Sequence, residues 1–183
     1  MKMNFHTQDL CLRTNLQCFE KQAGAGNFFM KIQWKTLFIC LLIPLAVGGI
    51  SAFLTKDGME AFNAANKPPL TPPNWLFPVV WTILFILMGI ASYLVATSGK
   101  PSQAALTVYG LQLVFNFLWS IFFFNMQWYL FAFVWLLVLW FLILVTTMSF
   151  KQISKAAGYL MVPYLLWVTF AGYLNFGVYL VNR

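Results

Sequence analysis

The feature that most constrains this chain is the spacing of its charged side chains. Between residues 36 and 181 they occur only in the short stretches 56–67, 100 and 151–155, and the segments between are strongly apolar. A helix of about 20 apolar residues crosses a bilayer. Soluble domains carry roughly 25% charged residues, whereas this chain carries 8%. The sequence therefore predicts an all-α integral membrane protein.

Five segments have the length and composition of membrane-spanning helices. We expect a bundle of five transmembrane helices, with spans at roughly 36–54, 76–97, 104–124, 128–149 and 157–181. Residues 1–33 are polar and mixed, which predicts a disordered N-terminal tail before a membrane domain of residues 34–183. The alternative is that Met30 is the true start and residues 1–29 are not translated.

Only the connection between the first two spans, residues 55–74, is long. It contains four prolines within six residues, between Pro68 and Pro73. Proline fixes φ, restricts the residue before it and removes an amide donor. This segment is therefore predicted to form a stiff lid over one mouth of the bundle, and a plain rigid linker is the alternative interpretation.

Basic residues are distributed unequally between the two sides of the membrane. Eight lysines and arginines fall on the side that holds the N-terminus, and three fall on the opposite side. Because cytoplasmic loops are enriched in Lys and Arg, we expect a cytoplasmic N-terminus and an external C-terminus in a bacterial cell membrane. This topology accounts for the basic balance without nucleic acid as a partner.

The five predicted spans contain no Asp, Glu, Lys, Arg or His. Proton-driven carriers keep ionisable residues inside the membrane, and general acid–base catalysis needs a titratable side chain, so both functions are disfavoured. The chain has three cysteines, Cys11, Cys18 and Cys40, and one histidine, His6, without the spacing of metal ligands. We therefore expect no metal site and no bound cofactor.

Aromatic and polar side chains recur at helical spacing on three of the predicted spans. The three stripes are Trp81, Phe85, Met88 and Ser92; Tyr109, Gln112, Asn116, Trp119 and Phe123; and Trp167, Ala171, Leu174 and Val178. Each stripe lies on one helix face. One interpretation is that these faces pack together, with Gln112 and Asn116 bonded to neighbouring backbone. The other is an aromatic-walled pocket whose amide and indole groups orient a hydrophobic ligand.

Four blocks of residues strengthen the second interpretation. They are Lys67-Pro68 with Thr71-Pro72-Pro73-Asn74-Trp75; Val80-Trp81 with Met88-Gly89 and Ser92-Tyr93-Leu94-Val95; Gln112-Leu113 with Asn116, Trp119 and Phe122-Phe123; and Pro163-Tyr164-Leu165 with Trp167, Phe170-Ala171 and Leu174-Asn175. In these blocks, over about residues 35–183, the chain resembles the TspO/MBR family. This is the tryptophan-rich sensory protein or translocator protein family, also called the peripheral-type benzodiazepine receptor family.

The resemblance implies a five-helix bundle, often a homodimer, which binds porphyrins such as protoporphyrin IX, isoquinoline carboxamide drugs and, in animals, cholesterol. The porphyrin is a ligand rather than a cofactor. By the resemblance, the pocket lies between helices under the first long connection. The matching positions are Trp81, Asn116, Trp119, Trp167, Ala171 and Leu174.

Three functions are compatible with this resemblance. The leading hypothesis is a membrane receptor or carrier for porphyrins, with a role in tetrapyrrole regulation or stress response. The second is an enzyme that degrades porphyrin with light and oxygen, for which the resemblance implicates Trp81 and Trp167. The third is a non-catalytic scaffold or regulator that docks partner proteins.

The C-terminal segment and three departures from the family pattern complete the sequence-based expectations. Leu174, Tyr179 and Arg183 fit a weak sterol-binding pattern, and ordinary interfacial anchoring of Tyr179 and Arg183 is the alternative.

The three departures from the family pattern replace a Trp-Tyr pair, a lid tryptophan and a carboxylate. The residues that stand there are Ala61-Phe62, Leu70 and Trp135. Gly48 and Ala52 form a small-xxx-small pair, which alone gives thin support for a dimer.

Overall fold

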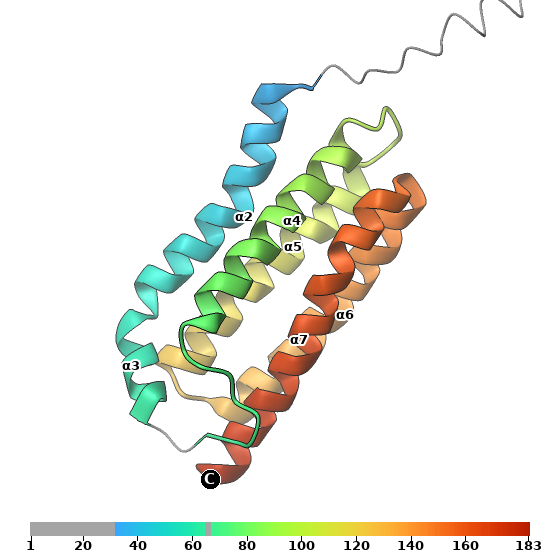
Figure 1. Ribbon diagram of the computed structural model, residues 1–183. Coiled ribbons are helices and arrows are strands. Elements are labelled where there is room, and N and C mark those ends of the chain that lie inside the picture. The colour runs from blue at the N-terminus through green and yellow to red at the C-terminus, as the bar shows by residue number, and fades with distance from the viewer. Residues whose placement is uncertain (1–31, 65–66) are drawn as a thin grey trace, which may run out of the picture. The chain divides into compact units, whose positions relative to one another are not determined.

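The computed structural model describes residues 32–64 and 67–183, and the predicted tail lies almost wholly outside these residues. Within the described ranges the secondary structure is entirely helical. Five helical segments are long and apolar enough to cross a membrane (Figure 1). They are α2 (Trp34–Leu54), α4 (Leu76–Ala96), α5 (Gln103–Ser120) with its continuation η2 (Ile121–Asn125), α6 (Tyr129–Ile153) and α7 (Lys155–Val181). The predicted all-α membrane protein with five spans is confirmed.

In the unit formed by residues 34–183, the helices make a closed ring. α2 packs on α4, α4 on α7, α7 on α6 and α6 on α5, and α5 returns to α2 (Figure 1). Short connections place α4 antiparallel to α5 and α6 antiparallel to α7. At the end of the bundle where α2 begins, Lys100 Nζ donates a hydrogen bond to the carbonyl oxygen of Ile153 at 2.8 Å. This bond ties the α4–α5 turn to the C-terminal end of α6.

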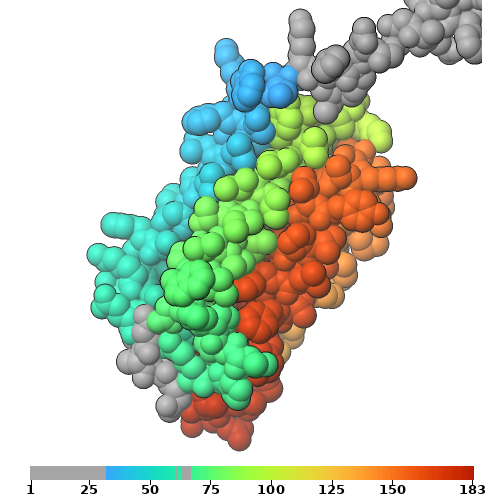
Figure 2. All heavy atoms as spheres, in the orientation of Figure 1, coloured from blue at the N-terminus to red at the C-terminus, as the bar shows by residue number. Residues whose placement is uncertain are grey.

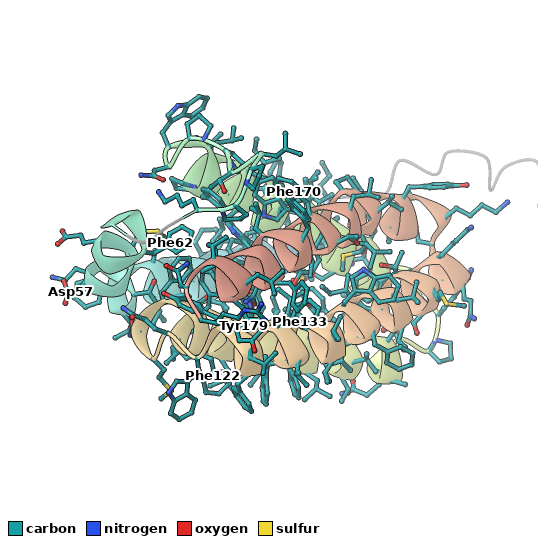
Figure 3. The ribbon with its side chains drawn as sticks, turned by 90° about the horizontal axis from the view of Figure 1, so that it is seen from below. Asp57, Phe62, Phe122, Phe133, Phe170 and Tyr179 are labelled. Carbon is teal, nitrogen blue, oxygen red and sulfur yellow. The ribbon has the colours of Figure 1, made fainter. Side chains whose placement is uncertain are left out.

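The long connection after α2 contains a short helix that the sequence analysis did not predict. α3 (Lys56–Ala64) lies at the end of the bundle opposite to the start of α2 (Figure 1). It is amphipathic: Phe62 is buried toward the bundle, whereas the Asp57 side chain points away from the other helices (Figure 3). The charged residues and Gly58 made this segment look like a loop, but one apolar face is enough to hold it as a helix.

The π-helical turn η2 was also not predicted. α3 packs against η2, and Asn125 Nδ2 donates to the carbonyl oxygen of Leu54 at 2.9 Å. That bond gives a donor to a carbonyl oxygen in the last turn of α2, where carbonyl groups have no amide partner within the helix. The wider turn of η2 therefore helps to hold α3 in place, consistent with the frequent use of π-turns near functional sites.

The proline-rich segment after α3 lies against the C-terminal end of α7 (Figure 2). The hydroxyl of Tyr173 on α7 donates to the carbonyl oxygen of Pro69 at 3.1 Å. A Cβ atom added at Gly177 would come within 2.7 Å of the Pro68 ring, so this close approach requires glycine. Two contacts with α7 thus fix the proline-rich segment at the α3 end of the bundle.

Candidate ligand cavity

A cavity of about 260 Å³ lies inside the bundle at its α3 end. Side chains from α2, α3, α4, α5, η2 and α7 surround it, together with Asn74 from the proline-rich segment. The lining residues are Gly48, Ser51, Ala52, Thr55, Met59, Phe62, Asn74, Phe77, Pro78, Trp81, Phe85, Asn116, Trp119, Ser120, Phe123, Phe124, Ala171, Leu174 and Asn175. Gly48 and Ala52, the small pair on the first span, both line this cavity, and Ala52 is also exposed at the surface.

Aromatic rings form a continuous wall of this cavity. Trp81 stacks on Phe85 with ring centroids 5.5 Å apart, and it lies 6.4 Å from Trp119. Trp119 stacks on Phe123 at 5.4 Å, and Phe62 of α3 contacts Phe123 at 5.4 Å. Rings in these arrangements add to the stability gained from burial alone. They give the cavity flat, rigid and apolar walls.

A directed chain of hydrogen bonds leads from the cavity wall into the core. Asn116 Nδ2 donates to the hydroxyl of Tyr164 at 2.9 Å, and this hydroxyl donates to Gln112 Oε1 at 2.9 Å. Gln112 Nε2 in turn donates to the sulfur of Met88 at 3.8 Å. Both amides were expected to bond neighbouring backbone if they served packing alone. They bond side chains of α7 and α4 instead, because the Tyr164 hydroxyl lies between them.

A second pair of hydrogen bonds fixes Trp119. Its Nε1 donates to Asn175 Oδ1 at 3.2 Å, and Asn175 Nδ2 donates to the carbonyl oxygen of Tyr129 at 2.8 Å. The hydrogen bond from the Trp119 indole N–H therefore fixes the orientation of the ring, and the face of the ring forms part of the cavity wall. Polar groups buried in an apolar interior need such partners.

Two cavity-lining groups keep hydrogen-bonding capacity for a ligand. Within the described ranges, the side-chain oxygen Oδ1 of Asn116 accepts no hydrogen bond, its Nδ2 being bonded to Tyr164, and the Trp81 indole N–H donates none. These two cavity-lining residues thus offer a ligand one acceptor and one donor beside the aromatic wall. A few such groups in an apolar pocket are the usual means of orienting a small molecule.

The structure brings five of the six predicted pocket residues together: Trp81, Asn116, Trp119, Ala171 and Leu174 all line the cavity. Trp167 does not line it. Its ring contacts Phe77, a lining residue, at a centroid distance of 6.0 Å, and its buried Nε1 has no hydrogen-bond partner in the described part of the chain. Trp167 therefore lies behind the wall, and its role in ligand binding stays a prediction.

The three residues of the weak sterol pattern lie in different surroundings. Leu174 lines the cavity. Tyr179 contacts the ring of Phe176 at 6.1 Å, and Arg183 is exposed beyond the end of α7. The structure thus does not bring these three side chains together into one surface.

The three departures from the family pattern lie at different places in the structure. Leu70 is 79% exposed and has a positive φ of 65°. Trp135 stacks on Phe115 at 4.4 Å and donates its Nε1 to the Phe115 carbonyl oxygen at 2.9 Å. Neither residue lines the cavity. The third departure, at Ala61-Phe62, places the Phe62 ring in the cavity wall.

Sequence reasoning missed Tyr164, Asn175 and the contribution of α3. The signal for the first two was present: Tyr164, Ala171 and Asn175 follow one another at helical spacing on α7. The predicted stripe began instead at Trp167, which rotated the expected face toward Phe77. α3 gave no comparable signal, because Phe62 contributes to the cavity only once η2 supports the helix.

Comparisons with known proteins identify the family of this chain. The model of the TspO/MBR family matches residues 40–180. The tryptophan-rich protein TspO of Chlorobaculum tepidum is 41% identical over 157 residues, which cover 84% of this chain and 99% of that protein. The tryptophan-rich sensory protein of Cereibacter sphaeroides is 37% identical over 153 residues, covering 84% and 95%. The translocator protein of Homo sapiens is 34% identical over 137 residues, covering 73% and 81%. The chain belongs to the TspO/MBR family of multi-pass membrane proteins.

Proposed function

We propose that this protein is a membrane receptor or carrier that binds porphyrins, such as protoporphyrin IX, and related flat hydrophobic ligands. The observation that carries this proposal is the cavity wall, where the Trp81 ring lies 5.5 Å from the ring of Phe85 and 6.4 Å from that of Trp119. A planar aromatic ligand gains dispersion and apolar burial against such rings. The proposed role is in tetrapyrrole regulation or a stress response.

The size of the cavity indicates how such a ligand enters. Pockets for drug-sized molecules have volumes of about 300–1,000 Å³, and this cavity has about 260 Å³. A porphyrin therefore needs additional space. α3 and the proline-rich segment supply Phe62 and Asn74 to the lining at one end of the cavity, so their displacement enlarges it. This fits a lid better than a plain linker.

Titration of the detergent-purified protein with protoporphyrin IX tests the proposal, with the Soret absorbance of the porphyrin as the readout. Trp81→Phe removes one indole and its N–H from the wall, and we expect affinity to fall about five- to tenfold, equivalent to ~1–1.4 kcal/mol. Trp34→Phe is the matched control, because Trp34 is exposed at the start of α2. Equal affinities in the wild type and Trp81→Phe would show that the cavity is not the porphyrin site.

A second candidate function is light- and oxygen-dependent degradation of the bound porphyrin. It is favoured by the contact of oxidisable rings, because Trp81 lies 6.1 Å from Tyr164 and 6.4 Å from Trp119. Illumination of the aerobic complex, followed by porphyrin absorbance, distinguishes this function from binding alone. Loss of porphyrin at the rate of the free dye would exclude it.

We also propose a bacterial cell membrane location with the α3 end outside, and a homodimeric assembly. The orientation is supported by the basic residues: Lys100, Lys151 and Lys155 are on the loops and helix ends opposite to α3. Labelling of single cysteines introduced at Ser98 and Asn182 with an impermeant maleimide on intact cells tests it. The homodimer rests on the family resemblance, and its test is the mass of the detergent-purified protein.

A further inference from the structure

The charge of the cavity lining limits where an acidic group of a ligand can lie. Among the described lining residues, none carries an ionisable acid or base: the polar members are serine, threonine, asparagine and tryptophan side chains. An isolated carboxylate in such surroundings loses its hydration, and no cation among these lining residues offsets that loss. A ligand that carries carboxylates must therefore keep them at the mouth of the cavity.

One lysine is held at that mouth. Lys67 Nζ donates to Asn74 Oδ1 at 3.1 Å and lies 5.2 Å from the centroid of the Phe62 ring. Asn74 and Phe62 both line the cavity. The ammonium therefore lies beside two lining side chains, one from the proline-rich segment and one from α3.

The backbone around Lys67 is fixed from its C-terminal side. Thr71 Oγ1 donates to the carbonyl oxygen of Pro68 at 2.7 Å, and the Tyr173 hydroxyl donates to that of Pro69 at 3.1 Å. The fixed φ of the following prolines restricts the segment further. Lys67 is thus presented from a constrained segment, which reduces the entropy lost when it binds an anion.

The other charged groups at this end of the bundle are placed differently. Lys56 lies over the ring of Phe53, which is 70% exposed and does not line the cavity. Asp57 points away from the helices (Figure 3), and both Glu60 on α3 and Arg183 beyond the end of α7 are exposed. Among the described residues at the α3 end, Lys67 is therefore the basic residue whose side chain contacts side chains that line the cavity.

We propose that Lys67 binds a carboxylate of the ligand at the cavity mouth and so selects flat aromatic ligands that carry an acid on one edge. This inference rests on the proposed function and deepens it, because it assigns the orientation of the ligand: rings inward, acid toward Lys67. The positive charge of the ammonium attracts the carboxylate, while the bond to Asn74 holds the side chain beside the cavity lining. Charge-assisted bonds of this kind are stronger than neutral ones.

Paired titrations with protoporphyrin IX and its dimethyl ester test the inference, because the ester keeps the ring and lacks the charges. We expect Lys67→Gln to weaken binding of the diacid about tenfold, equivalent to ~1.4 kcal/mol, and to leave ester binding within about twofold. The matched control is Lys56→Gln, which removes the same charge from the same end and should leave the diacid-to-ester ratio unchanged. Lys67→Arg should retain most of the diacid preference. Higher salt should weaken diacid binding by the wild type and not ester binding.

Ester binding also reports whether each variant keeps an intact cavity, so a folding defect in Lys67→Gln would be visible as loss of both ligands. In that event Lys67→Arg decides: an unchanged diacid-to-ester ratio supports the inference, and a ratio reduced to one overturns it. A wild-type protein that binds acid and ester equally well would refute the role of Lys67 and leave the proposed function standing. A wild type that binds neither would overturn the proposed function itself.

Discussion

The two halves of the bundle differ in how their inward helix faces meet: at the α3 end the faces enclose a cavity, and in the other half they pack closely. Toward the α3 end, α4 presents Trp81 and Phe85 to a cavity. One to three turns further along the same helix, Met88, Ala91 and Val95 are completely buried in close packing. Hydrophobicity does not explain this difference, because hydrophobic side chains line both halves. Side-chain shape explains it. Alanines let helices approach closely in a membrane, whereas large rigid indoles keep neighbouring helices apart and leave space between the rings.

A polar network marks the boundary between the halves. The Tyr164 hydroxyl joins Asn116, which lines the cavity, to Gln112, which is fully buried on the packed side. Because each group has one donor directed at the next acceptor, the network fixes the relative rotation of α5 and α7. The comparison therefore predicts that identical substitutions have different consequences on the two sides of this network.

The strongest test places the same large side chain in each half. Ala91→Phe inserts a ring where the alanine is 0% exposed, and we expect it to prevent recovery of folded protein. Overpacking typically costs about 1–3 kcal/mol and sometimes more, and α4 has no free space there. Ala171→Phe instead extends into the cavity of about 260 Å³, so folding should be retained and porphyrin affinity should fall at least about thirtyfold, or ~2 kcal/mol.

Folded yield in gel filtration and Soret titration measure the two effects. Ala46→Phe is the control for both variants, because Ala46 is exposed on α2 and does not line the cavity. If Ala91→Phe folds as well as Ala171→Phe, then the packed half is looser than the structure indicates and the comparison between the halves fails.

The next largest effect concerns the boundary itself. Tyr164→Phe keeps the ring but leaves the Asn116 donor and the Gln112 acceptor without their shared partner. Unsatisfied buried groups cost about 1–3 kcal/mol, and interhelical hydrogen bonds in membranes average less, so we expect the melting midpoint in detergent to fall by roughly 2–8 °C. Tyr159→Phe on the same helix is the control, since Tyr159 is 63% exposed. An unchanged midpoint for Tyr164→Phe would mean that water or a flipped amide replaces the hydroxyl.

The membrane spans could be predicted from the sequence, whereas the hydrogen-bond partners inside the bundle could not. The five spans follow from hydrophobicity and length, which act residue by residue, so their positions were correct to within a few residues. The buried stripe on α5 and η2, from Tyr109 to Phe123, also followed from helical spacing alone. The partners of Gln112 and Asn116 did not, because they depend on the rotation of α7 against α5.

The α3 end was predicted least well, because its structure depends on contacts between distant segments. The proline pattern predicted a stiff segment, and the structure adds a hydrogen bond from Tyr173 to the Pro69 carbonyl oxygen, which the sequence did not indicate. The helical form of residues 56–64 depends on support from η2, which no local pattern indicates. On α7 the local signal was present but was not used: the predicted stripe began at Trp167, although Tyr164 and Asn175 share a helix face with Ala171.

The junction of α3 with η2 offers a test of smaller magnitude. A Cβ atom at Gly58 would lie 2.5 Å from the Phe124 carbonyl oxygen, a backbone atom that cannot easily move. Gly58→Ala should therefore lift α3 from η2 and raise the dissociation rate of bound porphyrin about three- to tenfold, as measured by stopped-flow transfer to excess apomyoglobin. Gly49→Ala is the matched control, because a Cβ at Gly49 meets nothing within 4 Å. Equal dissociation rates in the two variants would argue against α3 as a lid.

The smallest expected effect decides between the sequence-based and structural positions of Trp167. The family resemblance places this residue in the pocket, whereas the structure places it behind Phe77, with its Nε1 unpartnered within the described ranges. Trp167→Phe removes that N–H and keeps an aromatic ring, so affinity for protoporphyrin should change less than about twofold and stability should hold, because an unsatisfied polar group is lost. Trp81→Phe, which alters the wall itself, is the comparison in the same Soret titration. If the two variants weaken binding equally, then α7 rotates when the ligand enters, bringing Trp167 into the wall and breaking the hydrogen bond between Tyr164 and Asn116.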